Sequence, residues 1–284
     1  SILGRPESLR RIELEDVLRF VSAHYRPDNA VLVVGGPVEA ASVAAEVRRR
    51  FGPAEPRGPD SRRPVRPSEP EGGSCQVLRE PGAGPSVYAM YPAPAVAEPE
   101  FEAALVLSSC LGGGADSALH RELVRERGIA VGVGATLLPT ERTGILHLCV
   151  RGRAGVEPRE LEAALLDVGE QLRDGGPPAE ALQGARRRLR RRRLTRLGRA
   201  ASRSFLVARD AVLRDRPRDL HRWPARIRAV DPASVRSLAR RFLRRERAST
   251  LRVAPRRGAG AESVPPAGAT APSADTSGAA REGG

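Results

Sequence analysis

A helix followed by an apolar strand occurs twice in this 284-residue sequence, and the two copies superpose with one constant offset (230 minus 12). The first copy is residues 12–33 and the second is residues 230–251. Each copy has an acidic helix start, an amphipathic helix and a short apolar run. Matching positions are Val17 with Val235, Phe20 with Leu238, and Ala30 with Ala248. The match favours an internal duplication, and two unrelated helix–strand units are the alternative.

The repeat divides the chain into parts of different composition. The first copy closes a unit of which only about 50 residues are present, whereas the second closes a much longer unit. A stretch rich in Pro, Arg, Gly and Glu separates them and predicts a linker, and a Gly, Ala, Ser and Pro-rich end predicts a disordered tail. The predicted parts are the end of a first domain at 1–53, the linker at 54–74, a complete second domain at 75–255 and the tail at 256–284.

Hydrophobic periodicity and turn residues predict both helices and strands in each unit. The first unit has predicted helices at 12–25 and 38–51, and an apolar run at 30–34 that is typical of a buried strand. The second unit has predicted strands at 76–79, 86–91, 130–138, 144–151 and 250–254, and predicted helices at 98–111, 118–127, 158–173, 178–214, near Trp223, and at 232–244. The strands at 130–138 and 144–151 are expected to pair as a hairpin.

Arginine supplies all 48 basic residues, against 34 acidic residues, for a net charge of +14. The exclusion of Lys, with heavy use of Ala, Gly and Pro, favours a coding bias toward GC-rich codons over selection for one ligand. The densest run, 186–199, predicts a helix with Leu189, Leu194 and Leu197 toward a core and its arginines toward solvent. This run has no aromatic, Asn or Gln side chain to stack on or read bases, so it is weak support for nucleic-acid binding.

The cellular compartment stays open. Cys75, Cys110 and Cys149 are odd in number and lack C-x-x-C spacing. No run approaches the roughly 18 to 20 apolar residues of a membrane-spanning helix. The chain begins with Ser1 and not with Met, which leaves open whether sequence precedes it. The composition is compatible with the cytoplasm or the periplasm of a GC-rich bacterium.

Three phrases resemble the insulinase or pitrilysin family of zinc metallopeptidases, which includes the mitochondrial processing peptidases. YRPDNAVLVVGG, near the start, resembles the end of the family's first domain. LGGGADSALHRELVRERGIAVGVGA and RIRAVDPASVRSLARRFL resemble a glycine loop with its helix and strand, and the closing helix, of the C-terminal domain. The resemblance covers about residues 2–255. It implies an α+β fold of homologous two-layer sheet-and-helix domains of the processing-peptidase type that enclose a substrate chamber, the first only partly present here.

The family's chemistry rests on an inverted zinc motif, H-x-x-E-H, with a more distal Glu as third ligand. Two imidazoles on one helix hold the metal, and the Glu of the motif is the base for zinc-bound water. The histidines here are His24, His120, His147 and His221, and no pair has that spacing. We therefore predict no catalytic residue, metal ligand or cofactor in this chain, and the resemblance implies zinc in the family's catalytic domain or partner.

A second departure lies inside the covered region. Family members that cut peptides carry a phrase like ELRE-x-x-G-L-A-Y in this region of the second domain. The Arg and Tyr of that phrase hold the substrate backbone near the zinc. With the phrase anchored on residues 128–130, the Arg position falls on Val124 and the Tyr position on Val131. Neither valine can donate a hydrogen bond, so backbone capture or oxyanion stabilisation is lost there. A slip of one residue places Arg125 at the Arg position, but nothing replaces the Tyr.

The loop Gly112-Gly113-Gly114 is a candidate substrate-binding segment. It is not a nucleotide cradle, because no GK[ST] follows it. In the non-cutting subunits of processing peptidases a glycine-rich loop helps to handle substrate, and the resemblance implies that role here. A plain helix-terminating loop is the alternative.

These observations lead to one main hypothesis and two alternatives. The chain is predicted to be an insulinase-family protein without a zinc motif, inactive by itself, that helps to enclose and bind a peptide substrate. Its expected partner is a catalytic peptidase domain or subunit of the same family. The alternatives are a C-terminal fragment of an active zinc metalloendopeptidase whose H-x-x-E-H lies upstream, and an Arg-rich nucleic-acid-binding protein.

Overall fold

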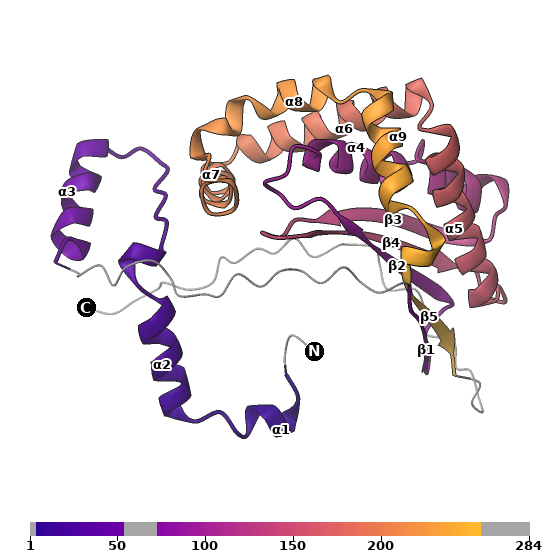
Figure 1. Ribbon diagram of the computed structural model, residues 1–284, viewed down its shortest axis with the longest axis horizontal. Helices are drawn as coiled ribbons and strands as arrows, with labels where there is room; N and C mark the ends of the chain where they lie inside the picture. Colours follow the sequence, from indigo (N-terminus) through magenta and orange to yellow (C-terminus); the bar gives the residue numbers. More distant parts are fainter. Residues whose placement is uncertain (1–3, 54–72, 257–284) are drawn as a thin grey trace.

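The computed structural model describes residues 4–53 and 73–256 (Figure 1). Residues 73–256 form a sheet with helices packed over it, and residues 4–53 form short helices joined by irregular segments. The predicted linker and tail lie outside the described residues, apart from residues 73, 74 and 256. Those two predictions therefore stay predictions.

Five strands form one mixed sheet in the order β1-β5-β2-β4-β3. β2 (Ser86–Ala93), β4 (Gly144–Gly152) and β3 (Ala130–Leu138) are antiparallel neighbours, which confirms the predicted hairpin. β5 (Ser249–Pro255) lies antiparallel to β2 and parallel to β1 (Cys75–Glu80). In β4 more and less buried residues alternate, as expected when one face of a strand packs on a core. β1 and β3 are the edges of this sheet.

Helices cover one face of the sheet (Figure 1), and together with it they make the α+β class that the sequence predicts. The helices of residues 73–256 are α4 (Phe101–Gly112), α5 (Pro158–Gly175), α6 (Ala179–Leu197), α7 (Ala200–Arg214), α8 (Trp223–Ala229) and α9 (Pro232–Phe242), with the short turns η2 (His120–Glu126), η3 (Pro217–His221) and η4 (Arg245–Arg247). α4 is buried along nearly its whole length and packs on β3, α6 and α9. The core between the layers is mostly aliphatic, with Leu107, Leu148 and Leu165 among its fully buried side chains.

Two predicted helices differ from the prediction. The region predicted as helical over 178–214 is two helices, because Arg199 is extended (φ −103°, ψ 128°) between them. The helix predicted over 118–127 contains a π-helix, η2, in which the backbone N–H of Arg127 donates to the carbonyl of Glu122 five residues earlier. Single π-helical turns are rare and frequently lie at functional sites.

The arginine-rich helix α6 turns a different face to the core from the one predicted. Leu189 packs against the core, but Leu194 is 60% exposed and the Arg193 side chain is only 7% exposed. Arg193 follows Leu189 by four residues, which places both on one face of the helix. Its guanidinium lies 5.2 Å from the ring centroid of Trp223, and its Nη2 lies 3.5 Å from Oδ2 of Asp210. The prediction that Leu194 faces the core is wrong. Arg193 lies on the core face because the Trp223 ring and the Asp210 carboxylate are partners for its guanidinium there.

The first part of the chain contains α1 (Pro6–Leu9), α2 (Leu14–His24), η1 (Pro27–Asn29) and α3 (Ala40–Phe51). Its two predicted helices are therefore confirmed. The buried strand predicted at 30–34 is wrong, because this segment forms no strand and Leu32 is 61% exposed. A strand needs a neighbour for its backbone N–H and C=O groups, and none of the strands in the described ranges pairs with this segment.

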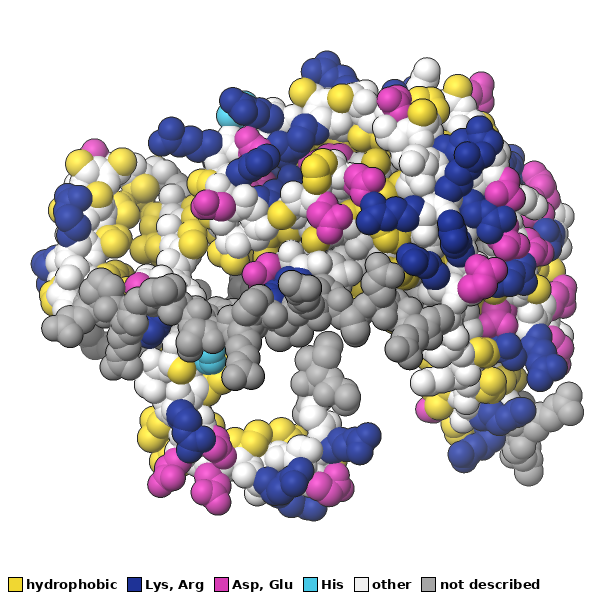
Figure 2. Space-filling model, in the orientation of Figure 1, with side chains coloured by type: hydrophobic (Ala, Val, Ile, Leu, Met, Phe, Trp, Pro, Cys, Tyr) yellow, Lys and Arg dark blue, Asp and Glu magenta, His cyan; other side chains and the backbone are white. Residues whose placement is uncertain are grey.

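The two sequence copies have the same local structure. α2 and α9 begin and end at one offset (232 minus 14 equals 242 minus 24), and η1 and η4 follow at that offset. In α9 the apolar face is buried, with Val235 and Leu238 in the core. In α2 no residue is buried, and the equivalent Val17 and Phe20 are 47% and 57% exposed. Figure 2 shows hydrophobic side chains on the surface of this part of the molecule.

Candidate functional site

The predicted glycine loop lies where α4 ends against β3. A Cβ atom on Gly112 would lie 2.4 Å from the backbone N of Ala135 and 2.6 Å from the carbonyl C of Gly134. A Cβ atom on Gly113 would lie 2.6 Å from the carbonyl O of Ser109. Rotation of a side chain cannot relieve contacts with backbone. Packing therefore explains why glycine occupies both positions. Gly112 lets α4 approach β3 closely, and Gly113 lets α4 end there.

Gly114 has different surroundings. A Cβ atom on it would lie 3.2 Å from Cδ of Arg188 and 3.2 Å from Oδ1 of Asp116, both of which belong to flexible side chains. Arg188 donates to Asp116, and this hydrogen bond lowers the pKa of the carboxyl. The same guanidinium donates from Nη2 to the carbonyl of Ser109 at 3.0 Å. An arginine of α6 thus holds the loop, and the substrate role of Gly112, Gly113 and Gly114 stays a prediction.

Val124 lies in the π-helical turn η2. Its side chain is half-buried and packs against the hydrophobic core. Arg125, the residue that a slip of one position brings to the same place, is exposed on that turn. The resemblance implies a substrate-holding arginine at this position. Here the position holds a valine whose side chain contributes to core packing.

Val131 lies at a bulge at the start of β3. The pairing with β4 skips it, since Ala130 pairs with Gly152 and Gly132 pairs with Arg151. A bulge leaves one residue unpaired and re-aims its side chain, and Val131 is 57% exposed. The place implied for the substrate-holding tyrosine is therefore open to solvent, but its side chain has no hydrogen-bond donor.

The predicted site residues do not form one cluster. Gly112 abuts Ala135, four residues along β3 from Val131, which corresponds to about 13 Å of strand. Within residues 4–53 and 73–256, no three His, Cys, Asp or Glu side chains form a group that could hold a metal ion. None of the helices in those ranges is both long and apolar enough to cross a membrane.

Sequence reasoning missed a cavity lined by arginines beside the glycine loop. The sequence pattern predicts a solvated helix face for the arginines at 186–199. The available signal was the spacing of Arg188, Arg192 and Arg196, which lie four residues apart and so form one stripe on a helix.

Comparison with known proteins identifies the fold and the family. No curated protein sequence matches the chain. Solved structures are similar to it, among them the following three. A protease from Helicobacter pylori has a TM-score of 0.80 at 18% identity over 89% of this chain and 62% of that one. The peptidase M16 inactive domain from Pseudomonas fluorescens has a TM-score of 0.77 at 20% identity over 89% and 60%. A putative M16-like peptidase from Alicyclobacillus acidocaldarius has a TM-score of 0.78 at 20% identity over 90% and 61%.

The structural matches establish the fold, and this chain spans 60% to 62% of the length of those three proteins. A family model described as the peptidase M16 inactive domain matches residues 11–189, which is more than half of the chain. The matched region includes the first sequence copy, the glycine loop and most of α6. The resemblance seen in the sequence is confirmed, and the chain belongs to the peptidase M16 inactive-domain family.

Proposed function

We propose that this chain is the non-catalytic half of a two-lobed peptidase assembly. It pairs with a zinc-bearing half of the same family and helps to enclose a peptide. The zinc-bearing half is either another part of the same polypeptide or a separate subunit. Membership of an inactive-domain family supports the non-catalytic role and does not favour the nucleic-acid alternative.

The uncovered apolar face of α2 is the observation that carries this proposal. Val17, Phe20 and Val21 are 47%, 57% and 42% exposed. In the second copy the matching face of α9 is buried against α4 and α5. A contiguous exposed apolar face marks an interaction site more often than a free surface. The zinc-bearing half is therefore expected to supply helices that cover α2 as α4 and α5 cover α9.

The segment 30–34 supports the same pairing. It matches the start of β5 at the offset that the two copies share, and β5 lies between β1 and β2 in the sheet. In the first copy, Val31 and Leu32 are 49% and 61% exposed. Pairing with strands of the zinc-bearing half would satisfy the backbone groups of this segment and bury both side chains.

The chemistry of cleavage is assigned to the other half. The sequence contains no H-x-x-E-H, so this chain does not bring the two imidazoles and the base of that motif. Val124 and Val131 add no hydrogen-bond donor. The contribution of this half is a wall for the substrate chamber.

The edge strand β3 supports a role in binding an extended peptide. β4 lies on one side of β3, and no strand of the described residues lies on the other. Free N–H and C=O groups at a sheet edge can add a peptide as a further strand. The bulge at Val131 lies on this strand and leaves its side chain exposed.

The pairing is tested with Phe20→Asp. The chain is mixed with the H-x-x-E-H-bearing family member of the same genome, and the dissociation constant is measured by calorimetry. A carboxylate in the centre of an apolar contact is expected to weaken association at least about tenfold. The free energy of unfolding of the chain itself should change by less than about 0.5 kcal/mol, because Phe20 is exposed.

Arg19→Asp is the matched control on the same helix. The Arg19 side chain is 74% exposed and pairs with Asp16 on the same helix at 3.3 Å. It is expected to leave the dissociation constant within about twofold, as is usual for residues at the rim of a contact. Equal affinity of the wild type and Phe20→Asp would exclude α2 as the pairing surface.

A further inference from the structure

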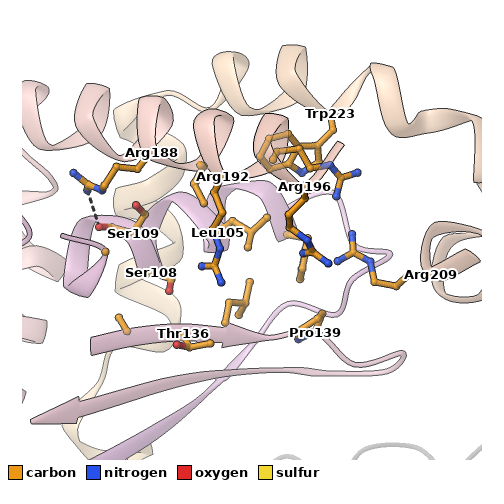
Figure 3. A pocket seen from close by; sticks show the side chains of 16 residues that line it. Leu105, Ser108, Ser109, Thr136, Pro139, Arg188, Arg192, Arg196, Arg209 and Trp223 are labelled. Atoms are coloured by element: carbon orange, nitrogen blue, oxygen red, sulfur yellow. Dashed lines mark hydrogen bonds between the residues drawn. The ribbon is translucent and has the colours of Figure 1, made fainter. Parts of the chain in front are cut away.

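A cavity of about 320 Å³ opens between α4, α6, α7 and the end of β3 (Figure 3). Its floor is apolar and includes Leu105 of α4, Leu137 of β3 and the adjacent Pro139. Its other walls carry arginines from α6 and α7, together with Leu189 of α6 and Trp223 of α8. Figure 3 shows the guanidinium group of Arg192 pointing from α6 toward β3, and those of Arg196 and Arg209 close together above Pro139. The cavity therefore has an apolar side and a cationic side.

The cationic side carries more positive charge than the acidic side chains of the described residues neutralise. Five arginines line the cavity, Arg188, Arg192, Arg193, Arg196 and Arg209. Two carboxylates pair with this set: Asp116 accepts from Arg188, and Asp210 lies 3.1 Å from Arg209 and 3.5 Å from Arg193. No acidic side chain of residues 4–53 or 73–256 forms an ion pair with Arg192 or Arg196. Five guanidinium groups against two carboxylates leave an excess of three positive charges.

Several of these guanidinium groups also have unused donors. The Arg193 side chain is 7% exposed, and its Nε and Nη2 are buried without a hydrogen-bond acceptor. The Nε atoms of Arg188 and Arg209 are buried without an acceptor as well. Burial lowers the pKa of Arg193 to about 10, and burial with the nearby charges of Arg209 and Arg192 lowers the pKa of Arg196. Arg193 and Arg209 share Asp210, so an anion in the cavity would give these buried donors further acceptors and would balance the exposed charges of Arg192 and Arg196.

We infer that this cavity binds the carboxylate side chains of an extended acidic peptide lying along the outer edge of β3. This inference rests on the proposed peptide-enclosing function and names its substrate class. The cavity is lined by Ala135, Thr136 and Leu137, which belong to the edge strand. In an added strand every second side chain points to the same face of the sheet, so alternate residues of the peptide turn toward the helices.

Geometry favours Glu and Asp over other anionic groups of a peptide. A guanidinium group binds a carboxylate through two parallel N–H donors, and α6 presents Arg192 and Arg196 one turn apart. The apolar floor suits the methylene groups of a Glu side chain. A free inorganic anion would use the guanidinium groups but would gain nothing from Leu105, Leu137 or Pro139.

The test measures binding of two fluorescein-labelled peptides to the full chain by anisotropy. One peptide alternates Glu and Val over eight residues, and the other carries Gln in place of each Glu. The Glu peptide is expected to bind at least about tenfold more tightly than the Gln peptide, since each charged hydrogen bond contributes about 1.5 to 3 kcal/mol. Equal binding of the two peptides would overturn the inference.

The double variant Arg192→Gln/Arg196→Gln is expected to lose at least about tenfold in affinity for the Glu peptide. It should fold normally, because both arginines are exposed and make no ion pair within the described ranges. The matched control is Arg190→Gln/Arg191→Gln, which removes two exposed arginines of the same helix that do not line the cavity. Equal losses in the two double variants would show a general charge effect and would overturn the inference.

Two further measurements identify the source of any failure. Inorganic tripolyphosphate is titrated in place of the peptide, and tight binding of it without binding of the Glu peptide would overturn the peptide assignment in favour of a free-anion site. Association of Arg192→Gln/Arg196→Gln with the zinc-bearing half is expected to equal that of the wild type. Failure of the wild-type chain to bind the Glu peptide, while it still associates with the zinc-bearing half, contradicts only this inference, whereas failure of the wild-type chain to associate contradicts the proposed function.

Discussion

Gly112→Ala is expected to lower the free energy of unfolding by about 3 kcal/mol, at the upper end of the range for added volume in a packed core. The new methyl group would lie 2.4 Å from the backbone N of Ala135 and 2.8 Å from its Cβ. Both atoms belong to β3, which is held in register by β4 along its length. α4 would have to move away from the sheet, and its buried apolar side chains would lose contacts. Urea denaturation followed by circular dichroism measures the change.

Gly84→Ala is the control for this variant. Apart from its chain neighbours, no part of residues 4–53 or 73–256 lies within 4 Å of a Cβ atom at Gly84, and its φ is not in the left-handed region. We expect a change within about 0.5 kcal/mol, as for surface substitutions in general. If Gly112→Ala were as stable as Gly84→Ala, the close approach of α4 to β3 would be refuted. Gly112 would then be free to serve substrate binding alone.

Glu102→Gln is expected to destabilise the protein by about 3 to 5 kcal/mol, the usual cost of removing one partner from a buried ion pair. The Glu102 carboxylate is buried, and its Oε1 accepts from Nη1 of Arg214 at 3.1 Å and from Nε of Arg226 at 3.0 Å. Arg226 would keep Asp219 at 2.8 Å. The Gln amide oxygen can still accept from Arg214, whose side chain is 8% exposed, but the negative charge that pairs with this buried guanidinium would be lost.

Glu100→Gln is the matched control two residues earlier. Glu100 pairs with Arg241 at 2.8 Å, but the two side chains are 46% and 58% exposed. Exposed ion pairs contribute about 0 to 1 kcal/mol, so this variant should unfold close to the wild type. A similar decrease in the free energy of unfolding in both variants would show that burial does not determine how much the Glu102 ion pairs contribute to stability. Thermal unfolding by differential scanning calorimetry measures both.

The sequence predicted those elements whose local pattern agrees with their packing. The strands of the β3–β4 hairpin and helix α9 carry apolar residues at the spacing that their own neighbours in this chain bury. The repeat, with its constant offset, predicted the matching bounds of α2 and α9, because identical spacing of apolar residues specifies the same helix. Periodicity could not predict which of these two helices has its apolar face buried.

The incorrect predictions share one physical origin. Partners that are distant in sequence determine whether a segment forms a strand and which of its side chains are buried. The apolar run 30–34 has strand composition, but in the described residues no strand accompanies it. Arg193 lies on the core face of α6 because its guanidinium contacts the Trp223 ring of α8 and pairs with Asp210 of α7. The arginine cavity was missed for the same reason, since α4, α7 and β3 complete it.

The glycine loop illustrates how far a sequence phrase determines a role. Gly112, Gly113 and Gly114 were predicted to bind substrate by resemblance, and the geometry adds a packing reason for the first two. Gly113 also lines the arginine cavity, so the loop and the cavity are neighbours. A substrate role for the loop would therefore act at the border of the cavity proposed for acidic side chains.

Peptide hydrolysis by the separate and combined halves tests the central claim most directly. A quenched fluorescent peptide library is incubated with zinc and with this chain, the H-x-x-E-H-bearing family member, or both. The chain alone should produce no zinc-dependent signal, and its addition should raise the rate of the zinc-bearing half at least about tenfold by completing substrate positioning. Chelator-sensitive hydrolysis by this chain alone, or a mixture no faster than the zinc-bearing half, would contradict the account.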